Sequence, residues 1–196
     1  DNKFQLISNI EKDTASALET IRTEYLKMPQ IADLTASNRE LPLSGDNVAR
    51  VELMDRDTGE IFFIDRTIGD YNYLPFYNVQ LLAGRLFSPD YQADINQPIE
   101  GEQDTYRRSS IINQSTLNNM GFDLPEEALG KTMIINEINS DTRTISTIIG
   151  VVADTNFASL HSPIRPMMYQ VGLEGLWAVS LEYDRAKRAN LMETID

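Results

Sequence analysis

Ser159 and His161 are the residues best suited to nucleophilic chemistry, and they lie two positions apart. In an extended segment this spacing puts both side chains on one face, as a serine–histidine pair requires. His161 is the single histidine of the chain, so a metal site built from several imidazoles is excluded. No Gly-x-Ser-x-Gly turn is present to expose a serine nucleophile. We therefore interpret His161 as a surface or loop residue.

The tripeptide Asp57-Thr58-Gly59 also occurs in aspartic proteases, where the aspartate follows an apolar strand. Here Asp55 stands two residues before it, and the tripeptide lies between two predicted strands. A tight turn in which the glycine adopts a positive φ explains it better. Asp55, Asp57 and Gly59 also match part of a calcium-binding loop. An EF-hand, however, needs a glutamate six residues after the glycine, where Asp65 stands, and two flanking helices.

The other acidic candidates are one cluster and three single aspartates. Glu100, Glu102 and Asp104 could bind a cation loosely, although a solvated run of charge is the simpler interpretation. An enzyme would need two carboxylates to converge in a cleft with shifted pKa values, and the candidates are Asp65, Asp70 and Asp154. No glycine-rich phosphate-binding motif occurs, so the chain offers no cradle for nucleotide phosphates. We expect no catalytic, cofactor-binding or metal-binding residue, and the partner-binding residues stay unknown.

The composition is that of a folded, acidic chain. Of 196 residues, 41% are hydrophobic and 24% charged, which is typical of globular proteins. A net charge of −13 repels nucleic acid and anionic lipid head groups, so we expect no nucleic-acid partner. The absence of cysteine excludes disulfides; it fits an oxidising periplasm, and it also fits many cytosolic proteins. No apolar run approaches the roughly 20 residues that span a bilayer, and no signal peptide is recognisable.

These candidate residues are positioned by many strands and few helices. Asn113, in the formal glycosylation acceptor Asn113-Gln114-Ser115, is interpreted as a helix N-cap. Residues 88–108 are predicted to be a long loop and the most mobile part of the chain. A helix start at 190–193 with little chain after it indicates a piece of a longer protein. Periodicity predicts helices at 14–28 and 113–121 and a short aromatic-rich helix or turn at 70–78. It predicts strands at 4–7, 31–35, 51–54, 61–64, 79–87 (broken at Gly84), 110–112, 132–138, 142–152, 167–171 and 177–183. Because strands and helices do not alternate, the predicted fold class is α+β.

Three stretches, in order, resemble one family. The first is Phe76–Phe87, which ends in Gly-Arg-Leu-Phe. The second is Ile111–Gln114, followed by Leu117, Gly121 and the segment Ala128–Lys131. The third runs from Ile149 to His161 and reads Ile-Gly-Val-Val-Ala-Asp-Thr-Asn-Phe-Ala-Ser-Leu-His, with Pro166 beyond it. These segments are similar to the MacB-like periplasmic core domain of MacB/FtsX-type ABC-transporter permeases.

The resemblance implies two subdomains and a set of partners. A porter-like part would comprise residues 1–75 and 155–196, and a mostly β, sabre-like part would comprise residues 76–154. The family domain lies outside the inner membrane, between two transmembrane helices. It works with a cytoplasmic ABC ATPase, a second permease copy and, in some members, a periplasmic adaptor or envelope protein. ATP would be used by the separate ATPase subunit, and no cofactor is expected in this domain.

Two functions follow as hypotheses from different classes. The first is a non-catalytic extracytoplasmic permease domain that transmits an ATP-driven conformational change to a periplasmic substrate or partner. The second is the extracytoplasmic ligand-binding or sensor domain of a membrane receptor, since α+β input domains of this size also sit between two transmembrane helices. An ATPase that associates with the full-length protein would discriminate between them. The transported substrate and the role of the acidic loop at 88–108 are not specified by the sequence.

Overall fold

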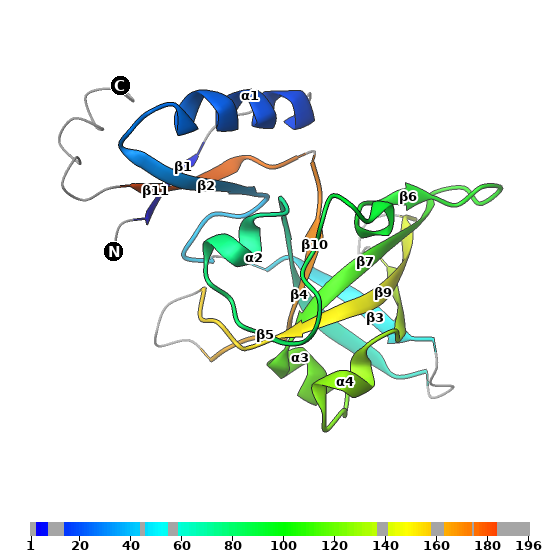
Figure 1. The fold of residues 1–196 in the computed structure, drawn as a ribbon. Helices are drawn as coiled ribbons and strands as arrows, with labels where there is room; N and C mark the ends of the chain where they lie inside the picture. Colours follow the sequence, from blue (N-terminus) through cyan, green and yellow to red (C-terminus); the bar gives the residue numbers. More distant parts are fainter. Residues whose placement is uncertain are drawn as a thin grey trace.

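Eleven strands and a few short helices make up the part of the chain that the computed structural model describes (Figure 1). That part comprises residues 3–7, 14–43, 46–54, 59–136, 141–157, 163–173 and 175–183. The helical elements are α1 (Thr14–Leu26), α2 (Tyr73–Phe76), the 3-10 turn η1 (Gln92–Asp94), α3 (Gln114–Asn119) and α4 (Pro125–Ala128). The strands are β1 (Lys3–Ile7), β2 (Ile31–Ser37), β3 (Val48–Leu53), β4 (Ile61–Gly69), β5 (Leu81–Gly84), β6 (Gln97–Pro98), β7 (Thr105–Asn113), β8 (Thr132–Asn136), β9 (Arg143–Val152), β10 (Met167–Val171) and β11 (Ala178–Tyr183).

Six of these strands pair in a closed ring, which we call the barrel. The order is β3–β4–β10–β7–β9–β8, and β8 pairs with β3 to close it. The β4–β10 and β7–β9 pairs are parallel, and the other four pairs are antiparallel. Closure leaves these strands without a free edge, which removes the hydrogen-bonding groups that an open sheet exposes.

The barrel interior is the largest apolar core among the described residues. Every strand of the ring contributes to it, because alternate side chains of each strand point inward. Two short helices, α3 and α4, add residues to the same core and so cover one end of the barrel (Figure 1). The buried members of this core are Ala49, Val51, Leu53, Phe62, Ile64, Ile112, Leu117, Met120, Ala128, Met133, Ile135, Ile148, Val151 and Met168.

A smaller unit, which we call the arm, consists of α1, β1, β2 and β11. Strands β2, β11 and β1 continue the sheet beyond β4, and Ser37 of β2 pairs with Gly69 at the end of β4. Helix α1 packs on the arm through Leu18, with Ile21 and Tyr25 beside it. The first and last described strands are neighbours, since β1 pairs antiparallel with β11. Chain segments from both ends of the sequence therefore lie together in the arm.

Most of the predicted elements are confirmed. The hairpins predicted at 51–64 and 132–152 are β3–β4 and β8–β9, and the helix predicted after Asn113 is α3. The mixed, mostly β structure with few helices agrees with the predicted fold class. The barrel takes strands from both predicted subdomains, and the division at residues 75 and 155 stays a prediction. The helix start at 190–193 lies outside the described residues.

The prediction of a long irregular loop at 88–108 is wrong in part. The segment contains η1, pairs β6 with β7, and β7 already begins at Thr105. The reason is Asp94, whose side chain is 0% exposed and which accepts two hydrogen bonds from Arg85, at 2.7 and 2.8 Å. Arg85 also stacks on the ring of Tyr91, with 3.8 Å between the guanidinium carbon and the ring centroid. One of the five carboxylates in residues 88–108 thus organises the loop.

Candidate functional site

A groove marks the junction where the arm meets the barrel. It has a volume of about 510 Å³, which is within the usual range for ligand or partner sites. Its walls come from β1, β11, the segment after β2, the end of α2 and the segment after β9. The residues that line it are Lys3, Gln5, Leu41, Pro42, Tyr77, Thr155, Asn156, Phe157 and Ser180. Thr155, Asn156 and Phe157 of the third sequence motif therefore lie where β1 and β11, the first and last described strands, meet the barrel.

Hydrogen bonds across the groove tie its walls together. Gln5 of β1 donates to Ser180 of β11 at 3.1 Å, and its carbonyl oxygen accepts from the backbone N–H of Leu41. The Tyr77 hydroxyl donates to Ser180 at 2.6 Å, and burial raises the pKa of that hydroxyl. Lys3 Nζ lies 4.6 Å from the ring centroid of Phe76. These contacts fix the walls of the groove relative to one another.

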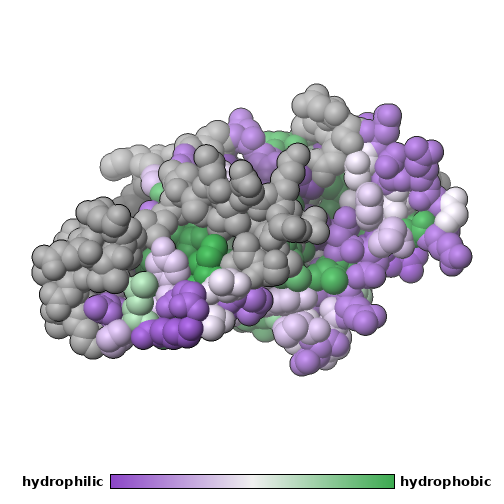
Figure 2. Space-filling model, turned by 90° about the horizontal axis from the view of Figure 1, so that it is seen from above, coloured by the Kyte–Doolittle hydropathy of each residue, from purple (hydrophilic) through white to green (hydrophobic). Residues whose placement is uncertain are grey.

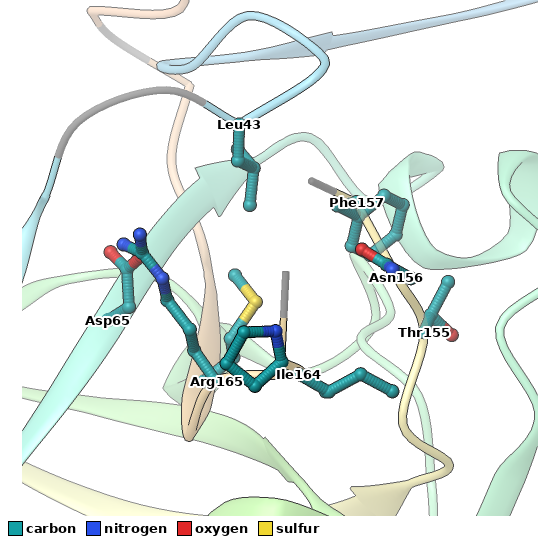
Figure 3. Close-up of a pocket in the computed structure, with 9 residues that line it drawn as sticks. Leu43, Asp65, Thr155, Asn156, Phe157, Ile164 and Arg165 are labelled. Carbon is teal, nitrogen blue, oxygen red and sulfur yellow. The ribbon is translucent and has the colours of Figure 1, made fainter. Parts of the chain in front are cut away.

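A buried ion pair lies on the other side of the 155–157 segment. Arg39 donates to Asp65 at 2.5 Å, and both side chains are buried. Arg165 lies 3.6 Å from the second oxygen of Asp65 and pairs with Asp46 at 2.6 Å. Figure 3 shows the guanidinium of Arg165 beside the carboxylate of Asp65, next to a cavity of about 20 Å³, which is room for one water molecule. The pair connects the segment after β2 to β4 of the barrel.

A second buried carboxylate holds α1 on the arm. Asp70 accepts hydrogen bonds from Arg22 of α1 at 2.7 Å and from Thr35 of β2 at 2.5 Å. The backbone N–H groups of Ala36 and Asn72 also donate to the Asp70 carboxylate. Burial raises the pKa of Asp70, and the hydrogen bonds from Thr35 and the nearby charge of Arg22 offset this only partly.

The carboxylate pair that an enzyme would need is not assembled from Asp65, Asp70 and Asp154. Asp65 lines the cavity of Figure 3, whereas Asp70 lines a separate cavity beneath α1. Asp154 accepts from the backbone and the hydroxyl of Ser115, at 2.9 and 2.7 Å, and so stabilises the start of α3. Each carboxylate has its own partners and a structural role.

The structure places the other candidates as follows. Asn113 is the N-cap of α3, as predicted, and accepts from the Thr116 backbone N–H at 3.0 Å. Glu100, Glu102 and Asp104 are exposed at the turn between β6 and β7. Ser159 and His161, and Asp55, Asp57 and Thr58, lie outside the described residues.

The basic partners of the buried carboxylates were missed by the sequence analysis. One signal was available for Asp65, because it directly follows the apolar run Phe62–Ile64 of a predicted strand. A carboxylate in such a place is buried, and a buried charge needs a cation or several donors. Which arginine supplies the charge could not be deduced, since Arg39 and Arg165 are distant in sequence.

Comparison with solved structures decides the fold. No family model matches the sequence, and no curated protein matches it either. The periplasmic region of MacB from Actinobacillus actinomycetemcomitans superposes with a TM-score of 0.57 and 14% identity, over 99% of this chain and 84% of that one. This chain has the fold of the MacB periplasmic region. The resemblance predicted from three sequence motifs is thereby confirmed.

Two further structures share this MacB-like fold. The extracellular domain of the noncanonic ABC-type transporter YknZ from Gram-positive bacteria superposes with a TM-score of 0.56 and 14% identity, over 97% of this chain and 88% of that one. A domain from Porphyromonas gingivalis, described as part of a permease protein, gives a TM-score of 0.50 and 17% identity, over 87% and 73%. Within the described residues, no helix has the length and apolarity that crossing a membrane requires.

Proposed function

We propose that this chain is the extracytoplasmic domain of an ABC-transporter permease, that it catalyses nothing itself, and that it passes an ATP-driven conformational change to a periplasmic substrate or partner. The likeness of its fold to the extracytoplasmic domains of MacB and YknZ carries the proposal. The permease would lie in the inner membrane and pair with a second copy. A separate cytoplasmic ATPase subunit would bind the ATP, and a periplasmic adaptor or envelope protein would be a further partner.

The structure supports a transmitting role through the junction. Segments from both ends of the described chain lie in the arm, so a movement of the membrane part would reach the arm first. The segment after arm strand β2 is joined to barrel strand β4 by the Arg39–Asp65 pair and to the segment after barrel strand β9 by the Leu43–Phe157 backbone bond of 2.8 Å. Arm strand β11 is joined to the residue after α2 by the Tyr77–Ser180 hydrogen bond. Close-packed interiors with buried polar contacts transmit displacement with little loss. The barrel would then move with the arm.

The first test is co-purification of the full-length, membrane-embedded protein with its natural partners. We expect an ABC ATPase to be recovered. Recovery of a kinase or cyclase module, or of no partner, would contradict the proposal and favour the receptor hypothesis. The second test is Tyr77→Phe, which keeps the ring but removes the bond to Ser180. This variant should still bind the ATPase, yet ATP should change the hydrogen exchange of the barrel strands less than in the wild type.

A matched control for the second test is Tyr91→Phe. Tyr91 is half exposed and directly precedes η1, which contacts barrel strand β7. The control should leave the ATP-dependent exchange unchanged, because its ring still stacks on Arg85. Equal responses of the two variants would show that the Tyr77–Ser180 contact has no part in transmission.

A further inference from the structure

One half-strand of the barrel is an exception to its closure. Strand β10 begins at Met167, opposite Asp65, so only the second half of β4 pairs with it. The first half, Ile61–Ile64, pairs with β3 on its other side. Among the described strands, none pairs with the remaining side of Ile61–Ile64. This stretch is a short open edge, which we call the β4 edge.

The register of β4 shows which of its backbone groups face β3. The N–H of Arg66 donates to the carbonyl oxygen of Asn47, at 2.9 Å. Hydrogen-bonded and non-hydrogen-bonded pairs alternate along an antiparallel ladder. In the β3–β4 register, the backbone groups of Phe62 and Ile64 therefore also face β3.

The residues between these positions direct their backbone groups to the opposite side of β4. The N–H of Asp65 confirms this direction, since it donates to the carbonyl oxygen of Pro166 at 3.0 Å. Ile61 and Phe63 have the same orientation, but none of the described residues forms a backbone hydrogen bond with them at the β4 edge. Two N–H and two C=O groups are thus left for a further strand.

The side chains at the β4 edge are apolar and exposed. Phe62 and Ile64 point into the barrel core, so Ile61 and Phe63 point outward. Figure 2, which shows the molecule from above, has a mainly hydrophilic surface with hydrophobic atoms recessed in hollows. Ile61 is nevertheless 41% exposed and Phe63 62%, the highest value for a large apolar side chain among the described residues. Open edges are commonly blunted by lysine, proline or a bulge, and the β4 edge contains none of these.

We propose that the β4 edge binds an extended peptide segment that has apolar side chains at alternate positions. The segment would continue the barrel sheet as a further strand, with backbone hydrogen bonds to Ile61 and Phe63. Its apolar side chains would pack against these two residues on the outer face of the sheet. Glu52 and Arg50 lie opposite them on β3 and form an ion pair of 2.9 Å. Because these charges offset each other, the strip favours apolar over charged side chains.

The experiment uses a matched pair of peptides on the 196-residue chain. The probe is acetyl-Thr-Val-Thr-Val-Thr-amide, and its control is the same peptide N-methylated at two adjacent central residues, which removes an N–H from each edge. In an amide NMR titration the probe should shift the signals of Ile61 and Phe63. The methylated peptide should bind at least about tenfold more weakly, because it loses backbone hydrogen bonds. Equal affinities, or no binding of the probe at millimolar concentration, would overturn the proposal.

Hydrogen exchange without peptide tests the edge itself. The N–H groups of Phe62 and Ile64 face β3 and should be protected, whereas those of Ile61 and Phe63 should exchange at least about tenfold faster. Protection of all four in the dilute chain would refute an open edge. Protection that rises with protein concentration, together with a dimer in sedimentation, would assign the edge to a second copy and overturn the peptide assignment.

The variant Phe63→Lys tests the side-chain contact. Because Phe63 is exposed, its replacement should affect folding little, and the probe should bind at least about threefold more weakly. Leu26→Lys is the control, since Leu26 is 43% exposed at the end of α1 on the arm, and it should bind as the wild type does. Equal affinities of the two variants would refute the assignment. The site needs no ATPase, so its failure would leave the proposed function standing.

Discussion

At the scale of single residues, Asp94 shows how its surroundings fix the charge of a carboxylate. Burial opposes its ionisation, but hydrogen bonds from Arg85, the Ser88 backbone and Ser109 outweigh burial, so the pKa of Asp94 lies below its ordinary value. A lowered pKa means that the ionised form stabilises the fold above the ordinary pKa. This stabilisation is lost as the pH falls through the lowered value.

Replacing Asp94 by Asn should therefore destabilise the protein in a pH-dependent way. We expect the free energy of unfolding at neutral pH to fall by about 2–3 kcal/mol, because the Arg85 charge loses its partner. The difference from the wild type should shrink in acid. Urea unfolding at neutral pH and at about pH 3 measures both. Asp90→Asn is the control, since Asp90 is exposed in the same loop, and a pH-independent difference for Asp94→Asn would contradict the account.

Asp70 is predicted to have the opposite pH dependence. Its pKa is raised, chiefly by burial, so the stability linked to this group is present below the ordinary pKa and is lost as the pH rises through the raised value. Asp70→Asn cannot ionise and escapes that loss. Urea unfolding between about pH 3 and pH 7 should show the variant gaining stability relative to the wild type as the pH rises. A stability difference between the variant and the wild type that does not change with pH would show that Arg22 and Thr35 fully compensate for burial.

At the scale of elements, two glycines let β5 cross β9 in backbone contact. A Cβ added at Gly84 would lie 2.2 Å from the carbonyl oxygen of Ile149, and one at Gly150 would lie 2.5 Å from that of Arg85. The backbone N–H of Arg85 donates to Ile149 at 3.0 Å at this crossing. The Gly-Arg pair of the first sequence motif and the Ile-Gly pair of the third thus meet in space. Both motifs are explained by one close approach.

A comparison of Gly84→Ala with Gly130→Ala separates the cost of the close approach between β5 and β9 from the cost of the positive-φ backbone conformation. Both glycines have a positive φ, of 78° and 77°, but a Cβ at Gly130 would meet nothing within 4 Å. In each variant the free energy of unfolding should fall by about 1–2 kcal/mol, because alanine is strained in the left-handed conformation. Gly84→Ala should lose a further 1–3 kcal/mol or so from the clash with Ile149. Thermal or urea unfolding measures the two losses, and equal values would show that the crossing relaxes freely.

Elements whose signal is local could be predicted from the sequence, whereas contacts between residues that are distant in the sequence could not. The β3–β4 and β8–β9 hairpins join neighbouring strands, so alternation and a turn were sufficient to predict them. The parallel β4–β10 and β7–β9 pairs have no such turn, and ring closure could not be foreseen. The loop containing Asp94 was judged by its composition, which does not reveal that Arg85 binds one of its carboxylates. At the junction, Arg39 and Ser180 were missed for the same reason.

At the scale of the whole molecule, the barrel and the arm should differ in stability. The barrel strands are paired on both sides around a fully buried core. Helix α1 has 13 residues, no acidic residue in its first turn and no basic residue in its last, and so depends on packing against the arm. We expect its amides to exchange with solvent at least about tenfold faster than those of β7 and β9, a difference of about 1.4 kcal/mol in opening free energy.

Native-state hydrogen exchange with peptide resolution tests this expectation. Uniform protection of α1 and the barrel strands would indicate one cooperative unit and would contradict it.

The antiparallel pairing of β1 with β11 has a mechanical consequence. Lys3 pairs with Glu182, so both strands continue toward the ends of the chain from the same end of their hydrogen-bond ladder. If two anchors drew these ends apart, the ladder would open one bond at a time, as in unzipping, and would resist only a small force. If the anchors moved together, every bond would share the load and the ladder would hold. The domain would then follow concerted motion of its anchors and yield to their separation.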